Sequence, residues 1–233
     1  MPTTTPPFRA DMVGSLLRPA TLKEARHKRE QGQITAVELQ RIEDQEIANV
    51  LAKQEEVGLQ LATDGEFRRS WWHFDFFWQL KGCERVVLDH GIQFQGIQTK
   101  PESLKVTGKL DFPADHAMLS HFRFLKANTR LVPKMTLPSP SVMHFRGGRN
   151  AISQQAYPDM SAYFDDLAKL YAKAIMAFYD AGCRYLQLDD TVWAYLCSKE
   201  QLAEAKARGE DVEKLPVFMP RLSTQHLKPS PPT

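Results

Sequence analysis

The sequence predicts an α/β protein with a parallel sheet, because one pattern occurs twice: a helix, a glycine, an apolar run and then acids. The copies are EVGLQLATDGEFRRS at residues 56–70 and DAGCRYLQLDDTVWA at residues 180–194. The glycine suits a left-handed helix cap. Parallel strands deliver such acids to their carboxyl ends, where α/β folds bind ligands. The alternative is that the acids only cap the next helix.

Helices are expected in four further stretches. Thr35 and Glu38 match a capping box, which predicts a helix that runs to about Val57. Apolar residues at 3.6-residue spacing predict another helix over residues 160–178. Residues 115–126 and the polar stretch 198–208 also favour helix.

Five apolar runs alternate with these helices and are expected to be strands. They are RADMVGS, which ends at Gly14 and Ser15, LQLATD, SLKVTGKLDF, LVPKMTLPSP and CRYLQLD, at residues 9–15, 59–64, 103–112, 131–140 and 183–189. Residues 71–100 are rich in Trp and show period-2 stretches, which predict an antiparallel insertion after strand two. The segment 141–150, SVMHFRGGRN, is expected to be a Gly/Arg-rich loop.

Alternating strands and helices predict a TIM-barrel-type (β/α) fold with about five of its eight units present. This partial barrel would occupy residues 1–215 as one domain, with the insertion at about 71–100. Its open edges would need a second copy or a complementary chain to cover them. The Pro-rich stretch 216–233 is expected to be a disordered tail.

The composition is that of an ordinary globular protein and argues against two classes of partner. The chain is 42% hydrophobic and 25% charged, with a formal net charge of +2. This balance favours neither nucleic acid nor an anionic membrane. No apolar run approaches the ~18–20 residues that span a bilayer, and the start of the chain does not resemble a signal peptide. A cytoplasmic location is therefore expected.

The ordered segments MVGSLLRP, TDGEFRR, KVTGKLDF, PKMTLPSPS and LQLDDTVWA resemble the cobalamin-independent methionine synthase superfamily. The likeness is to short single-barrel relatives of its C-terminal catalytic domain, and it covers roughly residues 8–215. It implies methyl transfer from a methylated folate to the thiol of homocysteine, or of a related amino acid, and so a place in methionine biosynthesis.

The resemblance also implies residue roles in substrate binding. Gly14 and Ser15 would hold the amino-acid carboxylate, and Glu66 and Asp189 its ammonium group. Elementary chemistry agrees, because an amino acid needs donors for its carboxylate and a carboxylate for its ammonium on one face of the site. No catalytic residue is assigned.

Two departures from the family pattern bear on activity. Larger synthases have a further acid six residues after the strand-five aspartate, and Tyr195 stands there. The family's zinc ligands come from the last three barrel strands, which this chain does not reach; His226 has no cysteine near it. The cysteines Cys83, Cys183 and Cys197 lack metal-ligand spacing. We therefore expect a truncated chain that alone binds no zinc and transfers no methyl group.

Several other residues have two interpretations. Arg68 and Arg69 are candidates for binding an anion, but they would equally pair with Glu66 or face solvent. The tryptophans of residues 71–78 are suited to stacking on a pterin ring and, more often in proteins, to core packing. The glycines of the segment 146–149 would cradle an anion or form a flexible turn.

Two rival functions remain open. One is a decarboxylase-like barrel of the same superfamily that acts on a tetrapyrrole through Arg18, Arg68 and Arg69. The other is a non-catalytic remnant or a fragment that requires a partner chain. A ligand that binds only the folded chain raises its thermal midpoint, which would separate homocysteine from a porphyrinogen.

Overall fold

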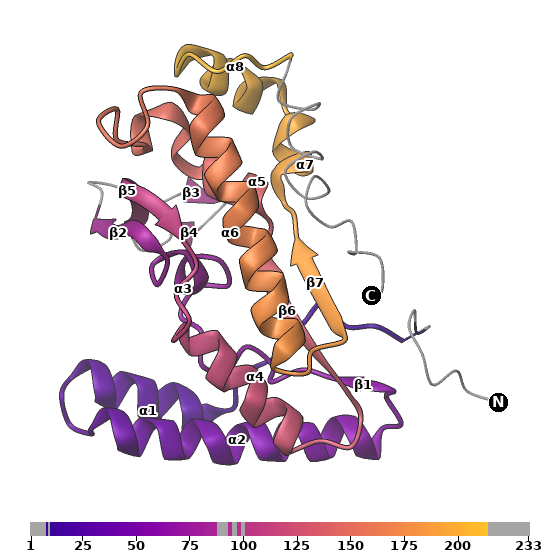
Figure 1. Ribbon diagram of the computed structural model, residues 1–233. Coiled ribbons are helices and arrows are strands. Elements are labelled where there is room, and N and C mark those ends of the chain that lie inside the picture. The colour runs from indigo at the N-terminus through magenta and orange to yellow at the C-terminus, as the bar shows by residue number, and fades with distance from the viewer. Residues whose placement is uncertain (1–7, 9, 88–92, 95–96, 99–100, 214–233) are drawn as a thin grey trace, which may run out of the picture. The chain divides into compact units, whose positions relative to one another are not determined.

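The computed structural model describes residues 8, 10–87, 93–94, 97–98 and 101–213 of the chain (Figure 1). These residues form two compact units. Unit 1 comprises Met1–Trp72, Ala117–Thr136 and Phe178–Gln187, and unit 2 comprises His73–His116, Leu137–Ala177 and Leu188–Thr233. The expected single domain over residues 1–215 stays a prediction. The expected tail at 216–233, His226 and much of the stretch 88–100 lie outside the described residues.

Two helices of unit 1 form where the sequence predicts them. The predicted ones are α2 (Ala36–Glu56) and α4 (Ala117–Ala127), and the unit also contains α1 (Ala20–Glu30), which was not predicted from the sequence. The capping box is confirmed, since Thr35 N donates to Glu38 Oε2 at 2.7 Å and Glu38 N donates to Thr35 Oγ1 at 3.2 Å. Gly58, with φ of +80°, follows the end of α2 as expected.

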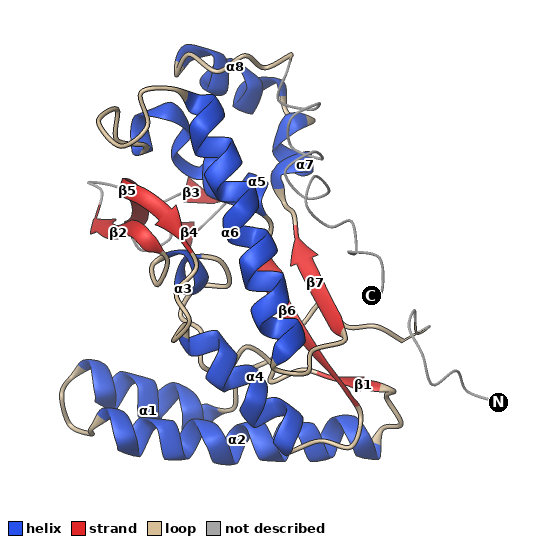
Figure 2. Ribbon diagram, viewed as in Figure 1, coloured by secondary structure: helices blue, strands red, loops and turns tan. Residues whose placement is uncertain are grey.

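A three-stranded sheet has the order β1-β6-β7 (Figure 2). Its strands are β1 (Leu61–Ala62), β6 (Val132–Pro138) and β7 (Tyr185–Asp189). β1 and β6 are parallel, with Leu61 opposite Val132. The α/β class is thus confirmed, and likewise the position of predicted strands two, four and five. The number of barrel units stays a prediction.

The first predicted strand was wrong. Residues 10–19 form no strand and run as an extended segment before α1. Side-chain donors replace the main-chain hydrogen bonds that a neighbouring strand would make. Lys134 Nζ donates to Met12 O, and Gln187 Nε2 donates to Val13 O at 2.9 Å. Gly14 then turns the chain with φ of +142°.

The insertion forms its own antiparallel pair in unit 2. It contains α3 (Phe74–Phe77), β2 (Lys81–Val87) and the short strands β3 (Gln93–Phe94) and β4 (Ile97–Gln98). β2 pairs antiparallel with β5 (Glu102–Asp111), and β3 pairs antiparallel with β4. The antiparallel excursion is therefore confirmed.

Predicted strand three requires a correction. It exists as β5, but it is not part of the β1-β6-β7 sheet. The insertion supplies a neighbouring strand that is close in sequence, and pairing with it closes a short loop at small entropic cost. A single parallel bridge joins Val106 to Ile152.

The predicted Gly/Arg-rich loop at 141–150 is also wrong. The structure has α5 (Pro140–Gly147) and the 3₁₀ helix η1 (Gly148–Ala151) in its place. Pro140 at the first helical position presets φ for a helix, and Val142 and Met143 are buried.

The remaining helices of the described residues are α6 (Met160–Asp180), α7 (Val192–Leu196) and α8 (Lys199–Ala207). Of these, α6 and α8 form where the sequence predicts helix, and α7 was not predicted. α6 buries the side chains that its 3.6-residue spacing selects, among them Tyr163, Leu167 and Leu170. Within the described part of the chain, no helix is both long and apolar enough to cross a membrane.

Candidate functional site

The candidate site lies in unit 1, in the turn that follows β1. Glu66 has φ of +59° and is the one non-glycine residue with positive φ in the described part of the chain. Asp64 stabilises this turn, because its Oδ1 accepts a bond from Glu66 N at 2.9 Å. A left-handed conformation is strained for a residue with a Cβ, and such strain is often found at functional sites.

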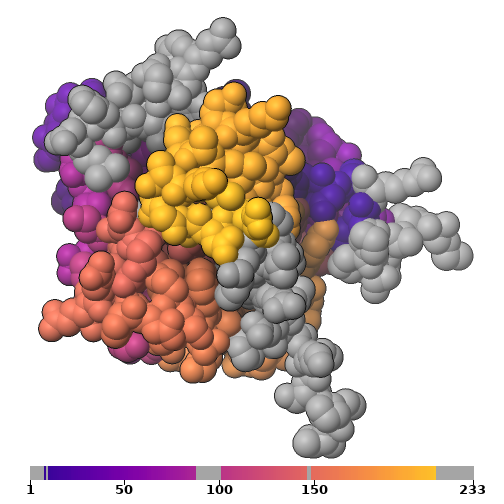
Figure 3. Space-filling model, turned by 90° about the horizontal axis from the view of Figure 1, so that it is seen from above, coloured from indigo at the N-terminus to yellow at the C-terminus, as the bar shows by residue number. Residues whose placement is uncertain are grey.

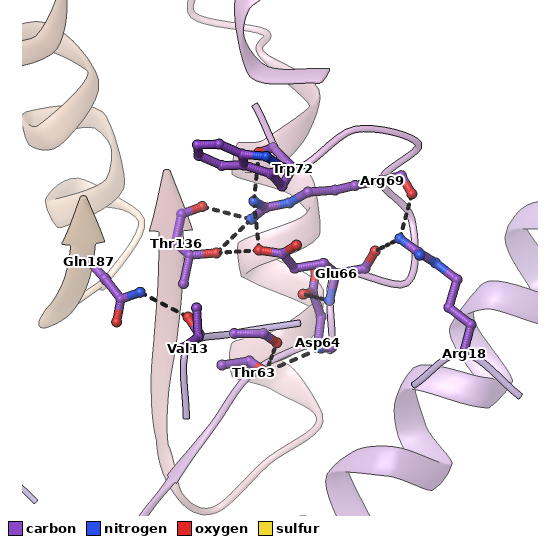
Figure 4. Close-up of polar contacts among 11 residues, drawn as sticks. Val13, Arg18, Thr63, Asp64, Glu66, Arg69, Trp72, Thr136 and Gln187 are labelled. Atoms are coloured by element: carbon purple, nitrogen blue, oxygen red, sulfur yellow. Dashed lines mark hydrogen bonds and ion pairs between the residues drawn. The ribbon is translucent and has the colours of Figure 1, made fainter. Parts of the chain in front are cut away.

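The two oxygens of the Glu66 carboxylate have different surroundings (Figure 4). Oε1 accepts bonds from Thr136 Oγ1 at 2.8 Å and from Arg69 Nη1 at 3.1 Å. Oε2 accepts no hydrogen bond from any residue that the structure describes. The side chain is 7% exposed, so its position is fixed while one acceptor oxygen stays available.

Gly14 lies against this carboxylate. A Cβ at Gly14 would be 3.5 Å from Glu66 Oε1 and only 2.7 Å from Thr136 Cγ2. Gly14 O accepts a bond from Thr63 Oγ1 at 2.7 Å, and Ser15, the next residue, is exposed. The structure thus brings the predicted residues Gly14 and Glu66 together.

An ion pair between the buried Lys134 and the more exposed Asp11 holds the segment before Gly14 in place. Lys134 Nζ donates to Asp11 Oδ1 at 2.6 Å, and the Lys134 side chain is fully buried. Tyr185 Oη donates to the other oxygen of Asp11. Partial burial raises the pKa of Asp11, but the bonds from Lys134 and Tyr185 outweigh it and hold this pKa below its ordinary value.

Arg69, a predicted anion-binding residue, donates to acceptors within the chain. It is 3% exposed and donates to Glu66, to Thr136 O at 2.7 Å and to Trp72 O at 3.3 Å. Of the interpretations open to Arg69, the structure shows the pairing with Glu66. Arg18 Nη2 binds the same turn, donating to Glu66 O at 2.8 Å and to Arg69 O at 2.7 Å.

Arg68, the other predicted anion-binding residue, forms ion pairs with Glu43 at 3.3 Å and with Asp44. Burial raises the pKa of Glu43 above its ordinary value, although Arg26 and Arg68 act in the opposite direction. Binding of an external anion by Arg68 or Arg69 stays a prediction.

The acids after β7 belong to unit 2. Asp190 Oδ1 accepts a bond at 3.0 Å from the N–H of Val192, the first residue of α7, and its Oδ2 accepts one at 2.6 Å from Ser141 Oγ. Asp189 is the last residue of β7, and its carbonyl accepts a bond from Ser139 N at 2.8 Å. Convergence of Asp189 with Glu66 and Ser15 stays a prediction, because Asp189 and Glu66 lie in different units.

Sequence reasoning missed Thr136 and Lys134, which bind the site from β6. Both are polar side chains in an otherwise apolar strand and are 2% and 1% exposed. This interruption of the apolar run was the available signal, because a buried polar side chain needs a partner.

The cysteines do not form a metal-binding cluster in the described residues. No group of three His, Cys, Asp or Glu side chains that are close enough to bind a metal occurs there. Burial raises the pKa of Cys83 to about 12 and also raises that of Cys183, whereas zinc binds the thiolate. Cys197 is exposed. The donor set therefore does not fit zinc.

The chain belongs to the family described as the cobalamin-independent synthase, catalytic domain, which it matches over residues 8–206. It is 50% identical over 213 residues to the uncharacterised protein YxjH of Bacillus subtilis and 48% identical over 212 residues to YxjG of the same organism. The matches cover 91% and 90% of this chain, which spans about 55% of the length of each relative.

A more distant relative has a stated activity. It is the 5-methyltetrahydropteroyltriglutamate–homocysteine methyltransferase of Thermosynechococcus vestitus, which is 29% identical over 191 residues. The match covers 80% of this chain and 24% of that protein.

Two solved structures share the fold. One is a Listeria monocytogenes protein with a provisional assignment as a vitamin-B12-independent methionine synthase; it has a TM-score of 0.78 and 44% identity, over 97% of this chain and 62% of that chain. The other, from Shewanella sp. W3-18-1, is a B12-independent methionine synthase in complex with selenomethionine. It has a TM-score of 0.52 and 17% identity, over 79% of this chain and 50% of that chain, and supports the fold alone.

Proposed function

We propose that unit 1 binds the amino-acid part of homocysteine, or of a related thiol, for methyl transfer from a methylated folate. Membership of the cobalamin-independent synthase family supports this proposal. The observation that carries it is the open Oε2 of Glu66, fixed beside Gly14 in a strained turn.

In this proposal the ammonium group of the substrate binds Glu66 Oε2. Arg69 and Thr136 hold Oε1, so little conformational freedom is lost when the ligand arrives. Charge-assisted hydrogen bonds in such a buried place are stronger than bonds between neutral groups. Asp189 is the proposed second acid for the same ammonium group.

The substrate carboxylate would bind the backbone and hydroxyl at Gly14 and Ser15. Gly14 O is already occupied by Thr63 Oγ1, so donors rather than acceptors remain at this position. A residue larger than glycine at position 14 would contact Thr136 and the Glu66 carboxylate. The glycine therefore lets main-chain donors approach a ligand that Glu66 also binds.

In this proposal the described residues bind and orient the substrate, and they do not activate its thiol. The described cysteines and acids do not supply zinc ligands, so no step is derived through that metal. The chain spans about 55% of the length of its Bacillus subtilis relatives. We therefore propose substrate binding for unit 1 itself, and methyl transfer for the reaction to which this binding contributes.

Calorimetric titration of the chain with homocysteine tests this proposal. Glu66→Gln should weaken binding about 10- to 150-fold, because it removes a charge-assisted bond of about 1.5–3 kcal/mol. The control is Glu24→Gln, an exposed acid of α1 whose partner is Lys28. Equal affinities of wild type and Glu66→Gln, or no binding by the wild type, would contradict the assignment.

A further inference from the structure

In unit 2, His144, Gly148 and the Arg149 N–H form a cradle around a carboxylate, in and beside the segment 146–149 for which the sequence leaves open an anion cradle or a flexible turn. Glu210, which follows α8, reaches α5 and η1. Its Oε2 lies 3.1 Å from His144 Nε2, and its Oε1 accepts a bond from Arg149 N at 3.0 Å. Figure 3 shows the yellow segment of α7 and α8 beside the salmon segment that contains α5 and η1.

Gly148 allows the carboxylate to approach the backbone. Its φ is +54°, and a Cβ at this position would overlap Glu210 Oε1. The same Cβ would lie 3.5 Å from Arg208 Nε, so a guanidinium group borders the cradle. The Arg149 N–H and the guanidinium group of Arg208 therefore both favour an anion at this place.

The charge of Glu210 is stabilised in this place. Burial raises its pKa, but the bond from His144, the Arg149 N–H and the charge of Arg208 together hold the pKa below its ordinary value. The carboxylate side chain is 13% exposed and ionised at neutral pH. The cradle therefore favours an anion although it is largely shielded from water.

Besides Arg208 Nε, two further buried polar atoms next to the cradle are not satisfied by Glu210. His144 Nδ1 and Tyr163 Oη are buried and have no hydrogen-bond partner in the described part of the chain. The two rings lie 5.9 Å apart between centroids, and the residues are 2% and 0% exposed. Because an unpaired buried polar atom is unfavourable, a ligand that forms hydrogen bonds with these atoms would gain affinity.

We propose that His144, Gly148 and the Arg149 N–H form a binding site for the carboxylate of a small ligand, and that Glu210 is its internal occupant. Glu210 and the ligand carboxylate then compete for the same donors. This site is separate in its residues from the amino-acid site of unit 1.

Displacement of Glu210 requires little rearrangement of the fold. Glu210 lies three residues beyond the end of α8, a nine-residue polar helix whose one fully buried side chain is Ala205. Segments with few buried apolar contacts open locally at low free energy. A tethered competitor has a high effective concentration, so the wild type should bind free carboxylates weakly.

Calorimetric titration with glutarate tests the proposal on the full chain. Glu210→Ala should bind glutarate at least tenfold more tightly than the wild type. The matched control is Glu204→Ala, which removes an exposed carboxylate of α8 and should bind as the wild type does. Adding Gly148→Ala to Glu210→Ala should abolish the gain, because the new Cβ fills the place of the carboxylate oxygen.

Other outcomes would overturn the inference. Equal glutarate affinities of Glu210→Ala and the wild type would do so, and tighter binding of inorganic phosphate than of glutarate would exclude a carboxylate ligand. If circular dichroism shows that Glu210→Ala is unfolded, the neutral isostere Glu210→Gln replaces it. Glutarate should then bind Glu210→Gln more tightly than the wild type, and equal affinities contradict the proposal.

Discussion

Glu66 of unit 1 and Glu210 of unit 2 are two carboxylates in similar cradles with opposite roles. Each lies against a glycine with positive φ, Gly14 in one case and Gly148 in the other. Glu66 has both its bonds on Oε1 and leaves Oε2 open, whereas Glu210 uses both oxygens. The first arrangement suits a receptor for a cation, and the second suits an occupant of an anion site.

The way each acid is attached explains this difference. Glu66 is part of a strained turn after β1 and is held by the buried Arg69. Glu210 follows the short helix α8 and is bound by an imidazole and a main-chain N–H. Replacing Glu66 therefore changes the proposed site for an ammonium group. Displacing Glu210 exposes the proposed site for a carboxylate.

The largest expected effect concerns the zinc content of the purified chain, which should be near zero or near one per chain. Cys183 belongs to unit 1 and Cys83 and Cys197 to unit 2, and the described residues contain no metal-ligand cluster. We expect well below one zinc per purified chain by elemental analysis. About one zinc per chain, lost when Cys183 or Cys197 is replaced by Ser, would show that the two acid cradles are not the main sites of chemistry.

Loss of the buried cation should be the next largest effect. Arg69→Met leaves the Glu66 carboxylate buried without its charge partner, which typically costs about 3–5 kcal/mol of unfolding free energy. The control, Arg130→Met, removes an arginine that is 89% exposed and pairs with Glu55, at a cost below about 1 kcal/mol. Urea unfolding measures both; similar losses would mean that Arg69 does not hold Glu66.

A smaller effect is expected from filling the space between Gly14 and Thr136. Gly14→Ala places a Cβ 2.7 Å from Thr136 Cγ2, and such overpacking costs about 1–3 kcal/mol in addition to strain. Gly32→Ala is the control, because Gly32 has φ of +72° and open space around it. Thermal unfolding should show the greater loss for Gly14→Ala, and the reverse order would refute the described contact with Thr136.

The pH dependence of Glu210 is the smallest expected effect. Its folded-state pKa is lower than its ordinary value of 4.5, so its contribution to stability is complete above that value and is lost as the pH falls through the folded-state pKa. The difference in stability between wild type and Glu210→Gln should therefore shrink below about pH 4.5. Asp11 titrates equally in both proteins and cancels. A difference that grows on acidification would contradict this sign.

Local signals predicted the helices α2, α4, α6 and α8 and the acid Glu66 of the site. The Thr35–Glu38 capping box forms as expected, and Glu66 follows β1 as the sequence pattern indicates. Asp64 and Asp190 also make local bonds, accepted from Glu66 N and from Val192 N. Each of these features depends on neighbours within a few residues.

Features that depend on distant residues were not predictable in this way. Replacement of the predicted first strand by bonds from the side chains of Lys134 and Gln187 depends on tertiary contacts. Glu210 is 61 residues from Arg149, and nothing in the surrounding polar stretch marks it. The positive φ of Glu66 is likewise invisible in its sequence.

A double-mutant cycle between Glu66 and the substrate ammonium group tests the central claim most directly. It compares homocysteine with 4-mercaptobutanoate, which lacks the amine, on the wild type and on Glu66→Gln by calorimetry. We expect Glu66→Gln to weaken homocysteine binding about 10- to 150-fold and to leave binding of the amine-free analogue nearly unchanged, a coupling of about 1.5–3 kcal/mol. Equal losses for the two ligands, and so no coupling, would show that Glu66 does not bind the ammonium group.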